Sequence, residues 1–264
     1  MLNVRSMSEH LAHSLAKTFA RSASVCLRRI VDLVYPPVCL GCGALTGRHG
    51  AVCASCWREI RFIERPYCEV LGLPFSYDPG PGMLCAQAIA HPPAFDRLRA
   101  AAIFDGAARN MVHGLKYRDR GDLAPIMAGW MERAGRDCLD CCDAILPVPL
   151  HRTRFVLRKF NQSAELARHL AKKTGKPYLP ATLVRTKRTK RQVGLTARAR
   201  EDNVRAAFGV AAGHEADVLG KRIVLIDDVY TTGATVSAAT RALKNAGAAE
   251  VSVLTFAMAL AETI

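Results

Sequence analysis

The sequence predicts an α/β protein with a mostly parallel sheet flanked by helices, preceded by a small cysteine-rich module. From residue 97 onward, short apolar runs alternate with longer helical stretches, which is typical of a parallel α/β sheet. Before that point, the chain carries two closely spaced Cys-x-x-Cys pairs within residues 39–56. Between these regions, residues 74–93 are rich in proline and glycine, which favours irregular chain and marks a boundary near residue 95.

The length and composition of the chain allow one ordinary α/β domain plus a small module. It has 264 residues, of which 50% are hydrophobic and 23% charged, close to the average for folded soluble proteins. We predict a basic arm or helix over residues 1–31, the cysteine-rich module over residues 32–96, and the α/β domain over residues 97–264. No apolar run approaches the roughly 18 to 20 residues that span a bilayer. The N-terminus also lacks the apolar segment of a signal peptide, so a cytoplasmic protein is expected.

The two Cys-x-x-Cys pairs have the spacing of a zinc ribbon. Cys39 and Cys42 form the first pair, and Cys53 and Cys56 form the second pair ten residues further on. Tetrahedral Zn²⁺ takes four thiolates, and the neighbouring glycines let the backbone turn tightly around the ion. We therefore predict a closed, structural zinc site. The alternative is four buried free cysteines, which is less favoured because paired knuckles rarely arise where there is so little core-forming pattern.

The sequence after the first ribbon resembles a second zinc ribbon that keeps only two of its four cysteines, here called the half-empty second ribbon. Leu71 stands three residues after Cys68, and Ala88 stands three residues after Cys85, where a second pair of knuckles would have cysteines. Two thiolates cannot close a tetrahedral site. His91 is an alternative ligand, but we expect the two cysteines to pack as small apolar side chains.

Four apolar runs are predicted to be strands, and the stretches around them are predicted to be helices. The expected strands cover residues 100–104, 144–148, 221–226 and 251–258, and the expected helices cover residues 106–116, 121–134, 161–174 and 234–247. Residues 175–215 are basic and broken by glycine and proline, so they predict an inserted loop or a small hood.

The most informative segment, residues 223–235, is a buried apolar strand that ends in two acids and a hydroxyl-rich turn. In open α/β sheets, ligands bind beyond the carboxyl ends of the strands, and a turn that leads into a helix offers free N–H groups to a phosphate. The residues of this turn that supply hydroxyl and amide donors are Thr231, Thr232, Gly233, Ala234 and Thr235. This turn is therefore predicted to hold a phosphate.

Asp227 and Asp228 would repel a phosphate placed directly on them, so they are expected to bind another part of the ligand. Carboxylates accept hydrogen bonds from the vicinal hydroxyls of a sugar. The acidic pair and the turn would then bind the two ends of one ribose 5-phosphate. The alternative is a strand end followed by a helix cap, but a cap needs only one such residue.

This segment resembles the phosphoribosyl pyrophosphate motif of type I phosphoribosyltransferases, an apolar strand followed by Asp-Asp-Val-x-Thr-Thr-Gly-x-Thr. More widely, the chain resembles the ComF family over roughly residues 32–259. Besides the ribbon, the motifs that carry this resemblance are residues 115–117 (Leu-Lys-Tyr), 148–152 (Val-Pro-Leu-His-Arg), 160–162 (Phe-Asn-Gln), 192–195 (Gln-Val-Gly-Leu) and 203–208 (Asn-Val-Arg-Ala-Ala-Phe). One departure is Lys159, because the family usually has glycine before Phe-Asn-Gln.

The resemblance implies a type I phosphoribosyltransferase fold that binds phosphoribosyl pyrophosphate together with Mg²⁺. Asp227 and Asp228 would be the catalytic-site residues and would bind the ribose. In the implied reaction, the C1–O bond to pyrophosphate breaks through an oxocarbenium-like state. By the same similarity, a loop after an earlier strand holds the pyrophosphate. Its residues here are Pro149, His151, Arg152, Arg154 and Arg158. Guanidinium groups pair bidentately with phosphate oxygens, although a solvated basic face is the alternative for each arginine.

The charge of the chain favours a polyanionic partner. The formal charge is +14, and residues 151–205 contain sixteen Arg or Lys against three acids. A phosphoribosyltransferase is favoured, but nothing in residues 175–215 indicates which acceptor substrate would receive the phosphoribosyl group. The second hypothesis, implied by the resemblance to ComF competence proteins, is a non-catalytic accessory protein in DNA uptake that binds single-stranded DNA or a competence helicase.

Overall fold

The computed structural model describes residues 32–117, 120–150, 161–185 and 207–260. The chain divides into two compact units, Met1–Cys53 and Ala54–Ile264. In chain order, the elements are α2 (Ala54–Glu59), α3 (Ala86–Ala90), β1 (Arg97–Ile103), α4 (Gly106–Tyr117), η1 (Gly121–Leu123), α5 (Ala124–Ala134), α6 (Arg136–Cys141), β2 (Ala144–Pro147), α8 (Gln162–Thr174), β3 (Leu183–Arg185), β4 (Phe208–Val210), η2 (Glu215–Asp217), β5 (Arg222–Tyr230), α10 (Ala234–Asn245) and β6 (Glu250–Met258). None of the helices within these described ranges is long and apolar enough to cross a membrane.

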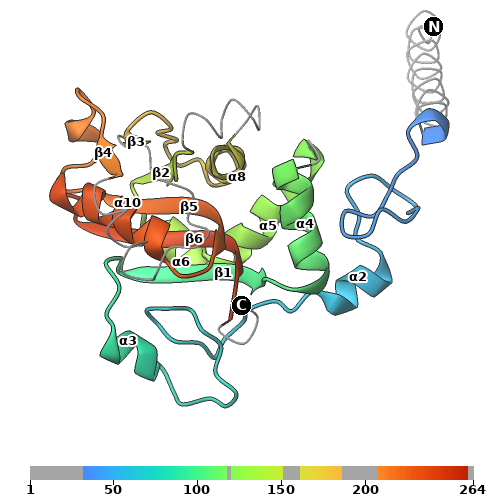
Figure 1. Cartoon of the computed structure of the whole chain (residues 1–264), viewed down its shortest axis with the longest axis horizontal. Coiled ribbons are helices and arrows are strands. Elements are labelled where there is room, and N and C mark those ends of the chain that lie inside the picture. Colours follow the sequence, from blue (N-terminus) through green and yellow to red (C-terminus); the bar gives the residue numbers. More distant parts are fainter. Residues whose placement is uncertain (1–31, 118–119, 151–160, 186–206, 261–264) are drawn as a thin grey trace, which may run out of the picture. The chain divides into compact units, whose positions relative to one another are not determined.

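The larger unit is built on a four-stranded parallel sheet with the strand order β1-β6-β5-β2 (Figure 1). One row of paired residues runs across all four strands, from Leu98 through Val253 and Leu225 to Leu146. All four of these side chains are buried in one core. A parallel sheet covered on both faces needs such apolar runs, which explains why these strands were recognisable in the sequence.

Helices cover both faces of this sheet. Successive side chains of a strand point to opposite faces, so each strand contributes apolar side chains to both sides. On one face, Val236 and Leu243 of α10 join the same core as Leu225 and Val253. On the other face, the ring of Trp130 in α5 stacks on Phe256 of β6 at a centroid distance of 6.0 Å. The helix α8 also packs on β2 and β5.

The predicted fold class is confirmed: each of the four expected strands and four expected helices corresponds to an element of the structure. Two details differ. The strand expected to end at residue 226 continues to Tyr230, so both aspartates lie within β5. Residues 175–215, expected as a loop or hood, contain the antiparallel pair β3 and β4, and η2 begins at their end.

The half-empty second ribbon packs directly against the sheet. The amide of Leu98 in β1 donates to the Val70 carbonyl at 2.8 Å. A Cβ on Gly72, whose φ is +62°, would lie 2.5 Å from the Leu98 carbonyl oxygen, so only glycine allows this close approach. Leu71 and Ala88, which stand where a second metal site would have cysteines, are buried in the core of the larger unit. Two apolar side chains of the core thus occupy positions where a complete second ribbon would have metal ligands.

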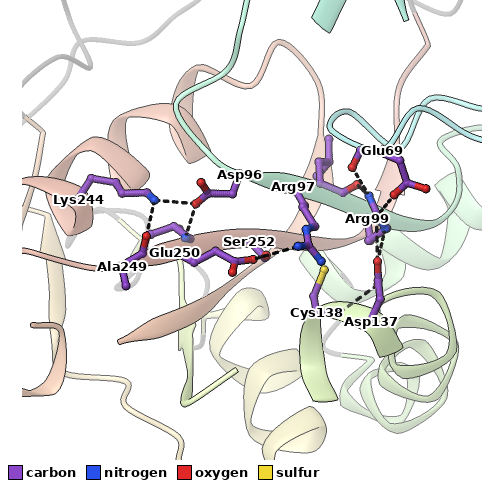
Figure 2. A network of polar contacts seen from close by, with 12 residues as sticks. Glu69, Asp96, Arg97, Arg99, Asp137, Cys138, Lys244, Ala249, Glu250 and Ser252 are labelled. Carbon is purple, nitrogen blue, oxygen red and sulfur yellow. Dashed lines mark hydrogen bonds and ion pairs between the residues drawn. The ribbon is translucent and has the colours of Figure 1, made fainter. Parts of the chain in front are cut away.

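Arg99 is a buried cation on β1, with only 2% of its surface exposed. Its Nη2 lies 3.0 Å from Oε2 of Glu69 and 2.8 Å from Oδ2 of Asp137, and its Nη1 donates to the Glu69 carbonyl (Figure 2). The Arg99 guanidinium also lies 4.8 Å from the ring centroid of Tyr67. Because Glu69 belongs to the second ribbon and Asp137 to α6, Arg99 ties both of these segments to the sheet.

Candidate functional site

The first ribbon brings four cysteines together. The sulfur atoms of Cys39, Cys42, Cys53 and Cys56, the cysteine cluster, all lie within 4.8 Å of one another. The Cys39 sulfur accepts N–H groups from Gly41 at 3.3 Å and Cys53 at 3.2 Å. Burial raises the pKa of Cys39, but these donors outweigh it and lower the pKa to about 6. Four thiolates gathered in this way are the ligand set of a structural zinc site. The prediction that these four cysteines form such a site is confirmed.

Cys68 and Cys85, the two cysteines of the second ribbon, have the backbone hydrogen bonds of a zinc knuckle without a full set of metal ligands. Cys68 accepts the amide of Leu71 at 3.4 Å and that of Cys85 at 3.3 Å. Within the described parts of the chain, the cysteine cluster is the only group of three or more metal-ligating side chains, and His91 does not join Cys68 and Cys85 in such a group.

The two predicted aspartates lie at the carboxyl end of β5, in a cleft of about 330 Å³. Asp228 is 7% exposed, and its Oδ2 lies 2.8 Å from Nζ of Lys116, which comes from α4. Asp227 Oδ1 accepts the hydroxyl of Ser163 at 2.8 Å and the amide of Asp228 at 2.9 Å. The cleft thus holds two adjacent carboxyl groups, each fixed by a different partner.

The two carboxyl groups of the cleft differ in their electrostatic environment. Burial, and then the neighbouring charge of Asp228, raise the pKa of Asp227 to about 7, although Ser163 and Lys116 oppose this rise. Near neutral pH, Asp227 therefore exchanges between an acid that can donate a hydrogen bond and a carboxylate that accepts one. Both forms suit a hydroxyl ligand.

The raised pKa of Asp227 predicts a pH dependence of stability. Between the ordinary pKa of 3.8 and about 7, the folded protein keeps a proton that the unfolded chain has released. Stability therefore falls as pH rises through this window and levels off above it. We expect the wild type to lose on the order of 2 kcal/mol relative to Asp227→Asn between pH 5 and 8. Urea denaturation of both proteins at each pH measures this change, and a wild type that gains stability relative to Asp227→Asn as pH rises would contradict it.

The turn after β5, here called the threonine loop (residues 231–235), is shaped by a single glycine. Gly233 has a φ of +73°, and a Cβ there would lie 2.7 Å from the Tyr230 hydroxyl. Thr231 and Thr235 line the same cleft as Asp227 and Asp228, and the loop leads directly into α10. A hollow of about 50 Å³ is lined by this loop together with Asp227, Val229, Tyr230 and Val236. The start of α10 can donate N–H groups to a small anion there.

The structure describes only one of the residues predicted to bind pyrophosphate. Pro149 lines the cleft together with the aspartates. His151, Arg152, Arg154 and Arg158 lie outside the described residues. Their role as pyrophosphate ligands stays a prediction, as does that of the basic residues within 186–206.

Sequence reasoning assigned no binding role to several residues of the cleft. Ser163 and Gln162 belong to the start of α8, where the Asn161 side chain accepts the Ser163 amide at 3.1 Å and donates to the Val148 carbonyl at 3.1 Å. An asparagine followed by a polar pair before a helix is a capping signal, which could have drawn attention to this segment. Gln162 is 1% exposed, and its Nε2 has no partner within the described residues.

Comparisons with known proteins agree with both parts of the chain. A family model described as a double zinc ribbon domain matches residues 30–89, and one described as a phosphoribosyl transferase domain matches residues 161–263. The DNA utilization protein YhgH of Salmonella typhimurium is 33% identical over 227 residues, which cover 84% of this chain and 96% of that protein. Competence protein F of Haemophilus influenzae is 27% identical over 221 residues, covering 81% and 94% respectively.

Among solved structures, the allosteric regulatory enzyme of purine biosynthesis is similar with a TM-score of 0.38 and 23% identity. The similarity covers 55% of this chain and 30% of that chain.

Proposed function

We propose that this chain, which belongs to the ComF family of proteins with a double zinc ribbon and a phosphoribosyltransferase domain, binds phosphoribosyl pyrophosphate in the cleft. One observation carries the proposal: Asp227, Asp228 and two threonines of the threonine loop line one cavity of about 330 Å³. A ribose 5-phosphate needs acceptors for its hydroxyls at one end and donors for its phosphate at the other. This cavity offers both.

Each part of the cleft has a role in this proposal. Asp227 and Asp228 accept the ribose hydroxyls, and Lys116 holds the Asp228 carboxylate in place through its 2.8 Å ion pair. The threonine loop holds the 5-phosphate through backbone amides and the hydroxyls of Thr231 and Thr235. Positioning of the ligand and neutralisation of its charge would lower the barrier to breaking the C1–O bond, because little covalent chemistry is asked of the protein.

Mg²⁺ fits this arrangement because carboxylate and phosphate oxygens are the hard ligands that it prefers. It would offset the charge of the pyrophosphate group when bound with the ligand. We place the protein in the cytoplasm, where a reducing environment keeps the thiols of the cysteine cluster available for zinc.

Calorimetry with phosphoribosyl pyrophosphate and Mg²⁺ tests the proposal. The variant Asp228→Asn removes the charge that pairs with Lys116, and we expect it to bind at least about 10-fold more weakly, a loss of roughly 1.4 kcal/mol. Asp140→Asn is a matched control, because Asp140 is exposed and its side chain has no hydrogen bond or ion pair within the described residues. Equal affinity of wild type and Asp228→Asn would overturn the proposed site.

A second candidate function is an accessory role in DNA uptake without turnover. It is favoured by the net charge of +14 and by relatives whose names refer to DNA utilization and competence. Pyrophosphate release across a set of candidate bases separates the two functions, because ligand binding without release favours the accessory role. Single-stranded DNA binding that weakens with salt and is unchanged by Thr232→Ala would place DNA on a different surface. No binding at low salt would remove the DNA hypothesis.

A further inference from the structure

A second cavity, the ribbon groove, lies between the second ribbon and α10. Its volume is about 380 Å³, and its wall is formed by residues around α3 and the following turn and by residues of β5, the threonine loop and α10. None of the aspartates of the cleft lines it. A cavity of this size falls within the range of sites that bind small molecules.

Several polar side chains of the wall can each donate a hydrogen bond into the ribbon groove. They are the guanidinium of Arg241, the hydroxyls of Thr232 and Ser237, the amide of Gln87 and the ring of His91, and no acidic residue is part of the wall. Arg241 is half-buried. Within the described ranges, its side chain makes no hydrogen bond, ion pair or ring contact, and neither does that of His91. A partly desolvated guanidinium without a partner is costly, so the groove is electrostatically suited to an anion.

The rest of the wall is largely apolar. Pro92 and Pro93 form one part, and Leu71 and Tyr230 form others. Leu71 is buried in the core, and the Tyr230 ring is held edge-on against Phe95 at a centroid distance of 6.2 Å. Proline and tyrosine rings offer flat surfaces on which a planar ring can stack. The ribbon groove therefore combines an anion position with an apolar surface.

We propose that the ribbon groove is a second binding site, for a nucleoside monophosphate or a ligand of the same chemistry. Arg241 and the hydroxyls of Thr232 and Ser237 bind the phosphate, and the prolines with Tyr230 contact the base. The half-empty second ribbon contributes to this site, because Leu71 and His91 both come from its segment. This gives the second ribbon a role that does not need metal.

The ribbon groove is distinct from the cleft, although both touch the threonine loop. Thr232 and Ala234 line the groove, whereas Thr231 lines the cleft. A ligand in the groove would therefore contact the same loop that we assign to the 5-phosphate. The two sites can be separated by variants that remove a charge from only one of them.

Calorimetry with AMP as the probe, on the zinc-loaded full chain, tests the proposal. We expect Arg241→Gln to weaken AMP binding at least about 10-fold, because it removes the charged phosphate donor and keeps much of the side-chain volume. Asp228→Asn is expected to leave one AMP site intact. Arg136→Gln, which removes an exposed arginine on α6 that is not part of the groove wall, is the matched control and should bind AMP as the wild type does.

Three results would overturn this assignment. One is no AMP binding by the wild type. Another is AMP binding that is lost in Asp228→Asn and unchanged in Arg241→Gln, because AMP would then occupy only the cleft. The third is equal binding of adenosine and AMP, since a site built around Arg241 must depend on the phosphate. Loss of phosphoribosyl pyrophosphate binding in Asp228→Asn tests the cleft alone, so failure of one proposal does not imply failure of the other.

Discussion

The variant Cys53→Ser is expected to lose its zinc and the fold of the first ribbon. The wild type should contain about one zinc ion per chain, because the cysteine cluster supplies one complete set of four thiolates and the second ribbon keeps only two cysteines. In small zinc modules, the binding free energy of the metal, roughly 10 kcal/mol or more, is also the folding free energy. Three remaining thiolates hold the ion far less tightly. Elemental analysis of the purified protein and limited proteolysis of residues 32–56 measure both losses.

Cys141→Ser is the matched control for zinc binding. Cys141 is an exposed free cysteine on α6, outside the cysteine cluster, so the same substitution should leave the zinc content unchanged. About two zinc ions per chain in the wild type would contradict our expectation that the second ribbon binds no metal. Full zinc content in Cys53→Ser would contradict the cluster itself.

The second large effect is expected at Arg99. Replacement by methionine keeps much of the side-chain volume and removes the cation that pairs with Glu69 and Asp137 (Figure 2). Breaking a buried ion pair by removing one partner costs about 3 to 5 kcal/mol. We expect a loss near the lower limit, roughly 3 kcal/mol, because both carboxylates are partly exposed and can be solvated. Urea denaturation of wild type and variant gives the change in the free energy of unfolding.

Arg97→Met on the same strand is a close control. The side chain of Arg97 is 43% exposed, and its guanidinium lies 3.9 Å from the Glu250 carboxylate. An exposed pair of this kind contributes less than about 1 kcal/mol. Equal losses in Arg97→Met and Arg99→Met would show that the buried network contributes nothing beyond the loss of a charged strand residue.

Features that are contiguous in the chain could be predicted from the sequence. The order of strands and helices follows from hydrophobic periodicity, which is a local property of each segment. The cysteine cluster follows from the spacing of two short motifs, because each knuckle is closed within a few residues. Asp227, Asp228 and the threonine loop were found together because they are consecutive at the end of one strand.

Other features depend on contacts between distant segments, which no local pattern reveals. Lys116 reads as an ordinary surface lysine until α4 brings its ammonium group to Asp228. Ser163 is separated from Asp227 by 64 residues, yet it donates to that carboxylate across the α8 and β5 interface. Arg99 reads as a charge that interrupts an apolar strand, and only the positions of Glu69 and Asp137 explain its burial.

The sequence by itself determined the fold class, the four cysteines that cluster and the pair of aspartates followed by the threonine loop. Each of these is specified by the dihedral and ligand preferences of residues that are close in the chain. The tertiary structure decided which charges face the cleft, how the second ribbon packs on the sheet, and that Arg241 and His91 line one groove. These outcomes depend on desolvation and ion pairing, and both are set by the packing of elements that are remote in sequence.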